Sequence, residues 1–252
     1  MPRAVRERFA PAGSQLNRYA SRLNGAEINS SFYRAHAFEV YERWSAAVPA
    51  GFRFSVKIPK LISHERGLRR AREPLGRFLD ESAGLGAKRG PLLLQLPPSF
   101  EYDDRRVGRF FDLLRGLYTG PVTCEPRHAS WVLEQATRTL ARFKVARVAA
   151  DPPRAPGLDE PAGWGGLIYY RWHGSPRMYF SPYDISTLRA LADTISKRKG
   201  NAQTWCIFDN TGSGAAAANA MDMNDLINLR DGHSQDRRGV ARKTVTRTIS
   251  GA

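Results

Sequence analysis

Residues 167–176 read LIYYRWHGSP. This run begins as an apolar and aromatic strand, becomes polar at Arg171 and His173, and is broken by Gly174 and Pro176. The same order of hydrophobic run, polar end, loop and helix recurs six times, with strands expected at 25–29, 52–57, 91–96, 122–125, 145–151 and 204–210. Alternating strands and helices are typical of a parallel sheet. A repeat of roughly 25–45 residues predicts an α/β fold of the (β/α)8 TIM type.

The predicted barrel lacks its first strand. Residues 1–13 are charged, contain Pro2 and Pro11, and do not alternate, so they predict no strand. We expect the natural protein to carry a further N-terminal strand, because an open barrel would leave two strand edges unpaired. The alternative is that residues 245–249, which alternate weakly, fill the gap. The domain prediction is a single barrel over residues 1–229, followed by a basic and disordered tail at 230–252.

The helices are predicted from apolar residues that recur at helical spacing. The expected ranges are 14–23, 37–47, 75–85, 103–117, 130–143, 185–197 and 215–229.

Composition favours a globular cytoplasmic protein. Hydrophobic residues make up 42% and charged residues 25% of 252 residues. No apolar run approaches the ~20 residues that span a bilayer, so we expect no membrane partner. Residues 1–8 also lack the apolar core of a secretory signal. Cys124 and Cys206 each lie in a predicted strand and are expected to be buried, reduced thiols.

The net charge of +15 raises the possibility of a nucleic-acid partner. The basic residues are, however, spread along the chain, and the clusters at 69–72 and 197–199 fall at predicted helix ends or loops. Zinc-finger spacing, an RRM-type signature and a basic zipper are all missing from the sequence. Nucleic-acid binding is therefore the alternative hypothesis, and a small anionic ligand is the leading one.

Strand alternation predicts where the polar side chains gather, since residues two apart share a face. One phase is largely polar and is expected to face the barrel interior: Glu27, Asn29, Arg53, Ser55, Lys57, Leu93, Gln95, Glu125, Arg127, Arg147, Asp151, Arg171, His173, Trp205, Ile207 and Asp209. The other phase is expected to face the helices: Ile28, Phe54, Val56, Leu94, Leu96, Cys124, Val148, Tyr170, Trp172, Cys206 and Phe208. Polar groups at the carboxyl ends of the strands predict a functional pocket there.

Three histidines lie outside the strands. His36 and His64 are expected at the surface, and His128 either belongs to the site or caps the next helix.

Two glycine-containing loops favour an anion site. Gly174 and Ser175 follow one strand, while Asn210, Thr211 and Gly212 follow the last. In barrels of this type a phosphate commonly binds at the corresponding loops, held by backbone N–H groups. The alternative is that these are two ordinary turns.

Six segments resemble the YecE-like family, also called domain of unknown function 72: residues 27–34 (EINSSFYR), 54–57 (FSVK), 90–98 (GPLLLQLPP), 125–131 (EPRHASW), 170–174 (YRWHG) and 208–211 (FDNT). The resemblance covers residues 2–229 and implies a TIM-type barrel, but it implies no particular reaction. Family members typically open with a strand that carries Gly-Trp, which is missing here. The chain after Leu229 has no counterpart in the family.

The leading hypothesis is an enzyme that acts on a phosphate ester or sugar derivative. Glu27, Glu125 and Asp209 supply carboxylates for acid–base work and His173 supplies a proton shuttle. Lys57, Arg127 and Arg171 bind substrate charge, together with Asn29, Gln95, Asp151 and the two loops. Hydrolase, lyase and isomerase chemistry all remain open.

Two other hypotheses compete with this one. A divalent metal held by the carboxylates and His173 is a variant that no local ligand motif supports, and no other cofactor is indicated. A non-enzymatic, nucleic-acid-binding or adaptor barrel is the alternative class.

Overall fold

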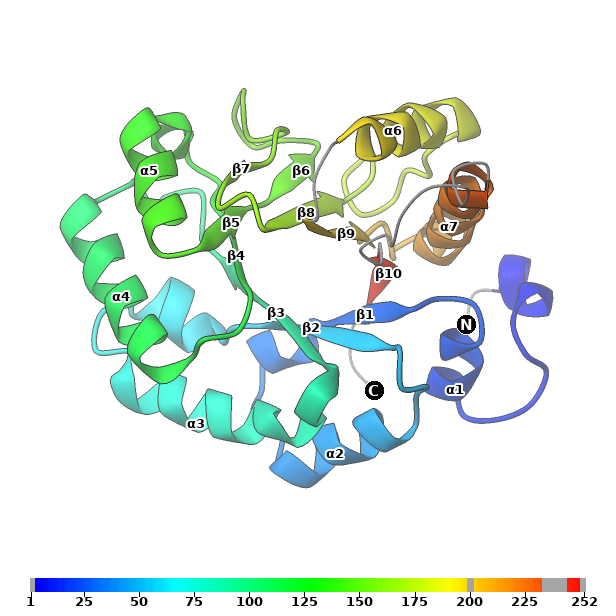
Figure 1. Ribbon diagram of the computed structural model, residues 1–252, viewed down its shortest axis with the longest axis horizontal. Helices are drawn as coiled ribbons and strands as arrows, with labels where there is room; N and C mark the ends of the chain where they lie inside the picture. The colour runs from blue at the N-terminus through cyan, green and yellow to red at the C-terminus, as the bar shows by residue number, and fades with distance from the viewer. Residues whose placement is uncertain (1–2, 199–201, 233–243, 250–252) are drawn as a thin grey trace.

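The computed structural model describes residues 3–198, 202–232 and 244–249. These residues form a mixed α/β fold around one ten-stranded, mostly parallel sheet, with helices on its outer side (Figure 1). The strands are β1 Gly25–Ile28, β2 Arg53–Lys57, β3 Arg89–Gln95, β4 Val122–Glu125, β5 Val145–Arg147, β6 Ala149–Asp151, β7 Ala162–Gly163, β8 Leu167–Trp172, β9 Gln203–Phe208 and β10 Thr244–Ile249.

The helices follow the strands much as the apolar spacing predicts. They are α1 Gln15–Ala20, α2 Phe38–Ala46, α3 Arg72–Ser82, α4 Asp104–Leu117, α5 Glu134–Arg142, α6 Ile185–Lys197 and α7 Ala215–Gly232. Short 3-10 or π turns occupy η1 Arg3–Arg8, η2 Ser30–Phe32, η3 Leu61–Glu65, η4 Ala83–Lys88 and η5 Ala129–Val132. Helix α4 shows the local logic: Asp103 caps its first turn through Arg106 N, and Val107, Phe110 and Leu114 are buried on one face. Within the described ranges, every helix is too short or too polar to cross a bilayer.

The alternation of the strands separates two cores. The larger core lies between strands and helices and includes Ile28, Val56, Leu94 and Phe208, as predicted. The smaller core lies on the inner face of the sheet and contains Leu93, Ala146, Val148, Leu167, Tyr169, Trp205 and Ile207. The two-residue period therefore predicts the faces of most strands correctly.

The prediction is wrong for the strand over residues 145–151. Val148 belongs to the inner core, so its neighbour Arg147 points to the opposite face and not into the interior. The Arg147 guanidinium donates hydrogen bonds to the carbonyls of Trp131, Gly157 and Glu160, which satisfy a buried charge on the helix side. Asp151 lies beyond Val148 in the separate strand β6, where it is half-buried.

Strand β10 fills the gap in the sheet. It pairs in parallel with β9, where Thr244 lies opposite Trp205, and with β1, where Thr246 lies opposite Gly25. The alternative that residues 245–249 fill the gap is thus confirmed. Two unpaired edges and a run rich in β-branched residues both favour this arrangement.

The expected disordered tail is therefore wrong where the structure describes it. Residues 230–232 end α7 and residues 244–249 form β10, while 233–243 and 250–252 lie outside the described residues. At the other end of the chain, Arg3–Arg8 form a 3-10 turn and no strand. This turn docks on α7 through Arg8, which pairs with Asp222 and Asp225.

The strand order is β6-β8-β9-β10-β1-β2-β3-β4-β5-β7. Strand β5 pairs with β4, and β6 pairs with β8. Strand β7 adds a short antiparallel pair to β5 that the sequence does not predict. The structure thus shows a parallel-rich α/β sheet, and the TIM-type barrel stays a prediction.

Candidate functional site

The centre of the candidate site is the fully buried guanidinium of Arg171 on β8. Its Nη2 lies 2.7 Å from Glu27 Oε1 on β1 and 3.2 Å from Asp209 Oδ2 after β9. Its Nη1 donates to Glu125 Oε2 on β4, and its Nε lies 3.1 Å from Glu27 Oε2. Burial alone would lower the pKa of Arg171, but the three carboxylates outweigh burial and raise it well above its usual value. Arg171 is therefore permanently charged and fully engaged.

Glu125 connects this arginine to the rest of the site. Its Oε1 lies 2.8 Å from Arg127 Nε and 3.1 Å from Gln95 Nε2 at the end of β3. Burial would raise the pKa of Glu125, but Arg171 and Arg127 outweigh it and hold the pKa well below its ordinary value. Glu125 is thus an ionised acceptor with two cations and an amide around it.

His173 is held by one ring nitrogen and open at the other. Its Nδ1 lies 3.1 Å from Asp209 Oδ2, while its Nε2 lies 3.6 Å from Glu125 Oε1, beyond hydrogen-bond range. Nε2 is buried and has no hydrogen-bond partner in the described part of the chain. Burial would lower the pKa of His173, but its interactions with Asp209 and Glu125 outweigh that effect and raise it.

Lys57 differs from the two arginines because its charge is not paired. Its side chain leaves the end of β2 almost fully buried, with Nζ 3.9 Å above the centre of the Phe32 ring. Within the described ranges it forms no ion pair. Burial, followed by repulsion from Arg171, lowers the pKa of Lys57 to about 8 against the attraction of the nearby carboxylates. Lys57 is thus a buried amine without a close carboxylate partner among the described residues.

Tyr169 is a further residue of the cluster that is not among those predicted from the sequence, and it contacts the same Glu27 carboxylate as Arg171. Its hydroxyl lies 2.8 Å from Glu27 Oε2 and 2.8 Å from Ser55 Oγ, and its ring stacks on Trp205. The signal that could have found it is alternation, since Tyr169 shares the phase of Arg171 on β8.

We expect Tyr169→Phe to lower the free energy of unfolding by about 1.5–3 kcal/mol, because the buried carboxylate of Glu27 loses a hydrogen-bond donor. Urea unfolding at pH 7 measures this. The matched control is Tyr170→Phe, whose hydroxyl points to the helix side and accepts from the half-exposed Arg198. An equal loss of unfolding free energy in both variants would show that the hydrogen bond to Glu27 stabilises the fold no more than the control contact does.

The two glycine-containing loops pack against each other. The Gly174 N–H donates to the Tyr183 hydroxyl, and the Gly212 N–H donates to the Tyr179 carbonyl. Gly174 has φ of 98°, and a Cβ there would lie 2.8 Å from the Ser181 carbonyl oxygen, so the turn requires glycine. Both amides are thus already used within the protein, and neither is an open donor for an anion.

The other predicted loop residues lie around this turn. Asn210 Nδ2 donates to the Ser181 carbonyl and to Asn219 Oδ1 on α7, which ties the loop to that helix. Ser175 is exposed and Thr211 is half-buried, at the rim of the turn. Asn210 therefore has a structural role in which the amide holds the loop after β8.

Two predicted residues lie beside the cluster and not in it. Asn29 follows β1, and its Oδ1 is buried without a hydrogen-bond partner in the described part of the chain. Asp151 ends β6, where burial raises the pKa of its carboxyl against the effect of the Tyr183 hydroxyl. Asp151 is close to Tyr183 and does not reach Arg171.

The expectation that His64 and His36 are surface residues is wrong. His64 is half-buried in η3, with its ring edge-on to Phe32, and its pKa is lowered by burial and then by Lys57 and Arg127. His36 is buried, lies 2.8 Å from Ser30 Oγ and packs on Tyr41. Neither residue carries a periodic signal, because each lies in a loop or an irregular turn.

Two further residues complete the picture around the cluster. His128 acts as a cap, since its Nδ1 accepts from the Ser130 backbone N–H. Tyr179 places its ring 5.6 Å from that of His173 and has φ of 67°, in the left-handed region. Tyr179 lies in an irregular loop, and nothing in the sequence indicates its position over His173.

The carboxylates do not form a metal site. Glu27, Glu125 and Asp209 each direct an oxygen at the Arg171 guanidinium, which occupies the position that a cation would take. Among the described residues, no group of three or more His, Cys, Asp or Glu side chains is arranged to hold an ion. The residues present thus do not fit the divalent metal considered from the sequence.

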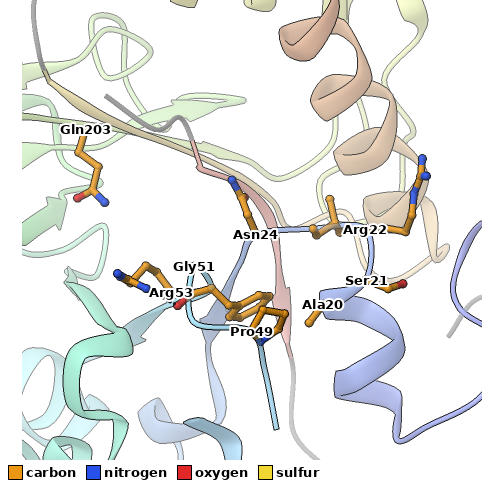
Figure 2. Close-up of a pocket in the computed structure, with 10 residues that line it drawn as sticks. Ala20, Ser21, Arg22, Asn24, Pro49, Gly51, Arg53 and Gln203 are labelled. Atoms are coloured by element: carbon orange, nitrogen blue, oxygen red, sulfur yellow. Dashed lines mark hydrogen bonds between the residues drawn. The ribbon is translucent and has the colours of Figure 1, made fainter. Parts of the chain in front are cut away.

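A cavity of about 470 Å³ lies at the opposite end of the sheet (Figure 2). Asn24, Arg53 and Gln203 line it at the amino ends of β1, β2 and β9. The described residues around it include neither a carboxylate nor a histidine. This cavity is therefore separate from the charged cluster, which gathers at the carboxyl ends of the strands.

Comparison with known proteins agrees with the resemblance. Residues 5–243 match the family model described as "Protein of unknown function DUF72", so the expectation that the chain after Leu229 has no counterpart in the family is wrong for residues 230–243. The UPF0759 protein YecE of Escherichia coli K12 is 34% identical over 131 residues, which are 51% of this chain and 47% of that protein; the same protein of strain O157:H7 matches equally. The aligned region thus spans about half the length of these relatives.

Two solved structures share the fold. A DUF72 family protein from Enterococcus faecalis V583 superposes with a TM-score of 0.74 at 23% identity, covering 89% of this chain and 92% of that one. A DUF72 family protein from Thermotoga maritima MSB8 gives a TM-score of 0.69 at 24% identity, covering 81% and 85%.

Proposed function

The chain belongs to the DUF72 family of proteins of unknown function, and we propose that it is an enzyme that acts on an anionic small molecule by acid–base chemistry. The observation that carries this proposal is the His173 imidazole. Its Nδ1 is held by Asp209, while its Nε2 is buried without a hydrogen-bond partner among the described residues, 3.6 Å from Glu125 Oε1. A buried ring nitrogen without a hydrogen bond is costly, which favours a role in proton transfer to a ligand.

His173 is the proton-transfer group in this proposal. Asp209 fixes the ring orientation and favours the imidazolium, so Nε2–H is the donor that faces the ligand. As general acid, His173 gives this proton to the substrate and then takes one back as base. Glu125 stays ionised against Arg171, because Arg171 and Arg127 hold its pKa below the ordinary value. Glu27 is bound to the same guanidinium, so in this proposal both carboxyl groups position Arg171 and do not transfer protons themselves.

Lys57 is the substrate-binding cation. Arg171 is engaged by three carboxylates and Arg127 by Glu125, whereas Lys57 has no ion pair in the described chain. An anionic group of a phosphate ester or sugar derivative would satisfy Lys57 while its reacting atoms lie near His173. Gln95, also buried and within reach of Glu125, adds an amide for hydrogen bonding. A single histidine that acts as general acid and base is compatible with hydrolase, lyase and isomerase chemistry.

We also propose that the sheet closes into a TIM-type barrel at Val148. This residue alone separates β5, which pairs with β4, from β6, which pairs with β8. Residues 145–151 would then act as one barrel strand that passes from one neighbour to the other. Closure supports the functional proposal, because barrel enzymes carry their chemistry at the carboxyl ends of the strands.

A turnover screen tests the role of His173. We expect the wild-type protein to convert at least one member of a panel of sugar phosphates and phosphate monoesters, and His173→Gln to reduce kcat by about 10²-fold or more. Because the pKa of His173 is raised, activity that needs the imidazolium should persist above the ordinary histidine range and fall as pH rises further.

His128→Gln is the matched control, since this histidine caps η5 and does not touch the cluster. Asp209→Asn should lower kcat and move the alkaline limb to lower pH, because the imidazolium loses its partner carboxylate. Equal turnover in the wild type and His173→Gln would refute the proposed role.

A further inference from the structure

A groove of about 520 Å³ lies between the first turn of α3 and the first half of α4, which are neighbours in the fold (Figure 1). Six arginines line it: Arg69, Arg70, Arg72, Arg105, Arg106 and Arg109. Asp103 is the single acidic residue among the described residues of the lining. The groove therefore carries a local charge of about +5.

The charges of this arginine groove are not neutralised within the protein. Arg106 pairs with Asp103 at 3.6 Å. The other five arginines are exposed, and no ion pair of theirs occurs within the described ranges. Some exposed arginines elsewhere on the helices pair one turn away, as Arg77 does with Glu73 and Arg138 with Glu134. What distinguishes the groove is that five arginines without an ion pair among the described residues lie together. The groove thus concentrates like charges that repel one another, which favours an external anion.

The backbone beside the groove is held in an unusual conformation. Leu68 and Arg70 have φ of 67° and 48°, in the left-handed region that side chains disfavour. Arg66 Nη1 donates to the Arg70 carbonyl, and Leu68 N donates to the Ile62 carbonyl. Strain of this kind is of order 1–3 kcal/mol per residue and is common at ligand clamps. It fixes the position of Arg69 and Arg70 at the groove.

The N-terminal ends of α3 and α4, which border the groove, differ in their capping. The first turn of α4 is capped by the Asp103 side chain, whereas Ala71 gives α3 no side-chain cap. The N-terminal end of α3 therefore adds partial positive charge next to Arg72.

From this arrangement we infer that the arginine groove binds the phosphate backbone of a nucleic acid. Planar guanidinium groups match phosphate oxygens in pairs, more closely than ammonium groups do. Of the apolar lining residues, Leu68, Ala71 and Phe110 are buried beneath the arginines and Leu113 is half-buried, so the described lining offers no exposed aromatic ring on which a base could stack. Contacts confined to the backbone position a nucleic acid without reading its sequence.

The location of the groove relates it to the candidate site. It is formed by the segments after β2 and β3, the strands that end in Lys57 and Gln95. A bound nucleic-acid strand would therefore lie near the carboxyl ends of the strands, the same end of the sheet as the charged cluster, but on the outer, helix-covered side. The binding inference stands on its own, because no groove residue takes part in the proposed chemistry.

Fluorescence anisotropy with a labelled oligothymidine in a salt series tests the inference on the full chain. The groove variant combines Arg69→Glu, Arg105→Glu and Arg109→Glu. We expect it to bind at least about 10²-fold more weakly than the wild type at low salt, and its slope of log K against log[salt] to be shallower by about 2. The control combines Arg6→Glu, Arg43→Glu and Arg189→Glu, three exposed arginines outside the groove that change the net charge equally.

The control variant should keep the wild-type salt slope and most of the affinity. Equal losses in the two variants would overturn the inference, because the overall charge and not the groove would then explain binding. Absence of salt-dependent binding by the wild type, or equal competition by polyglutamate, would overturn it too. Thermal unfolding verifies that both variants are folded. Turnover measured on the same variants separates this inference from the proposed enzymatic function, since neither triple variant should change kcat.

Discussion

Arg171→Met is expected to lower the free energy of unfolding at pH 7 by about 3–5 kcal/mol, because it leaves buried carboxylates without their cation. Arg171 engages Glu27, Glu125 and Asp209 at once, and its side chain is only 1% exposed. Methionine fills a similar volume, so most of the loss reflects uncompensated charge and little of it reflects a cavity. Urea unfolding at pH 7 measures the change.

The pH dependence gives this prediction a second readout. The pKa values of Glu125 and Asp209 are lowered, chiefly because Arg171 outweighs their burial. A lowered carboxyl pKa contributes stability that is present above the unfolded value of ~4 and is lost as pH falls through the folded pKa. In Arg171→Met these carboxyls accept protons more readily, so the difference from the wild type should shrink on acidification.

Two controls separate charge from packing. Arg138→Met removes an exposed arginine that pairs with Glu134, and should change stability by less than ~1 kcal/mol. Adding Glu27→Gln to Arg171→Met should recover part of the loss, because one buried negative charge is removed. If Arg171→Met cost no more than Arg138→Met, the cluster would not depend on Arg171.

The alternation of side chains along the strands predicts correctly that most residues of the candidate site lie close together. Glu27, Glu125, His173 and Asp209 come from four separate segments, yet a two-residue period places all of them at one end of the inner face. Alternation does not predict which of these residues form ion pairs or hydrogen bonds with one another. Three carboxylates and one arginine can pair in many ways, and only the structure shows that Arg171 takes all three.

The errors have local physical causes. Polarity and alternation predict that Arg147 faces the interior, but three backbone carbonyls on the helix side accept its hydrogen bonds. His64 and Tyr179 lie in irregular turns, where no period connects sequence position with direction. The strand at 244–249 follows a run of mostly polar sequence at 233–243, and its partner edges on β9 and β1 become visible only when the sheet is assembled.

The structure divides the three cations of the candidate site into two roles. The sequence suggests that Lys57, Arg127 and Arg171 share the task of binding substrate charge. In the structure, two of them are matched by carboxylates of the protein itself, and they serve to hold Glu125 and Glu27 in place. Lys57 forms no ion pair among the described residues, although the carboxylates of the cluster attract it at longer range. The proposed function therefore assigns the binding of substrate charge to this side chain.

We expect Lys57→Met to make the protein more stable at pH 7 while abolishing affinity for the anionic ligand. The pKa of Lys57 is lowered from 10.5 to about 8, first by burial and then by Arg171. Below pH 8 the amine is charged in both the folded and unfolded states, so the full penalty of burying it applies. Between pH 8 and the unfolded value of ~10.4 the unfolded state binds more protons, and the wild type gains stability as pH rises.

The expected gain for Lys57→Met is on the order of 2–3 kcal/mol at pH 7, after allowance for the lost contact with the Phe32 ring. Urea unfolding at pH 7 and pH 10 measures it, and the advantage should shrink at pH 10, where the wild-type lysine folds neutral. Lys60→Met is the matched control, because this lysine is exposed and pairs with Glu65, and its stability should stay within ~0.5 kcal/mol at both pH values. A loss of stability at pH 7 in Lys57→Met would mean that the carboxylates of the cluster already stabilise the charged amine. Lys57 would then have a structural role and would not be the residue that binds the anionic ligand.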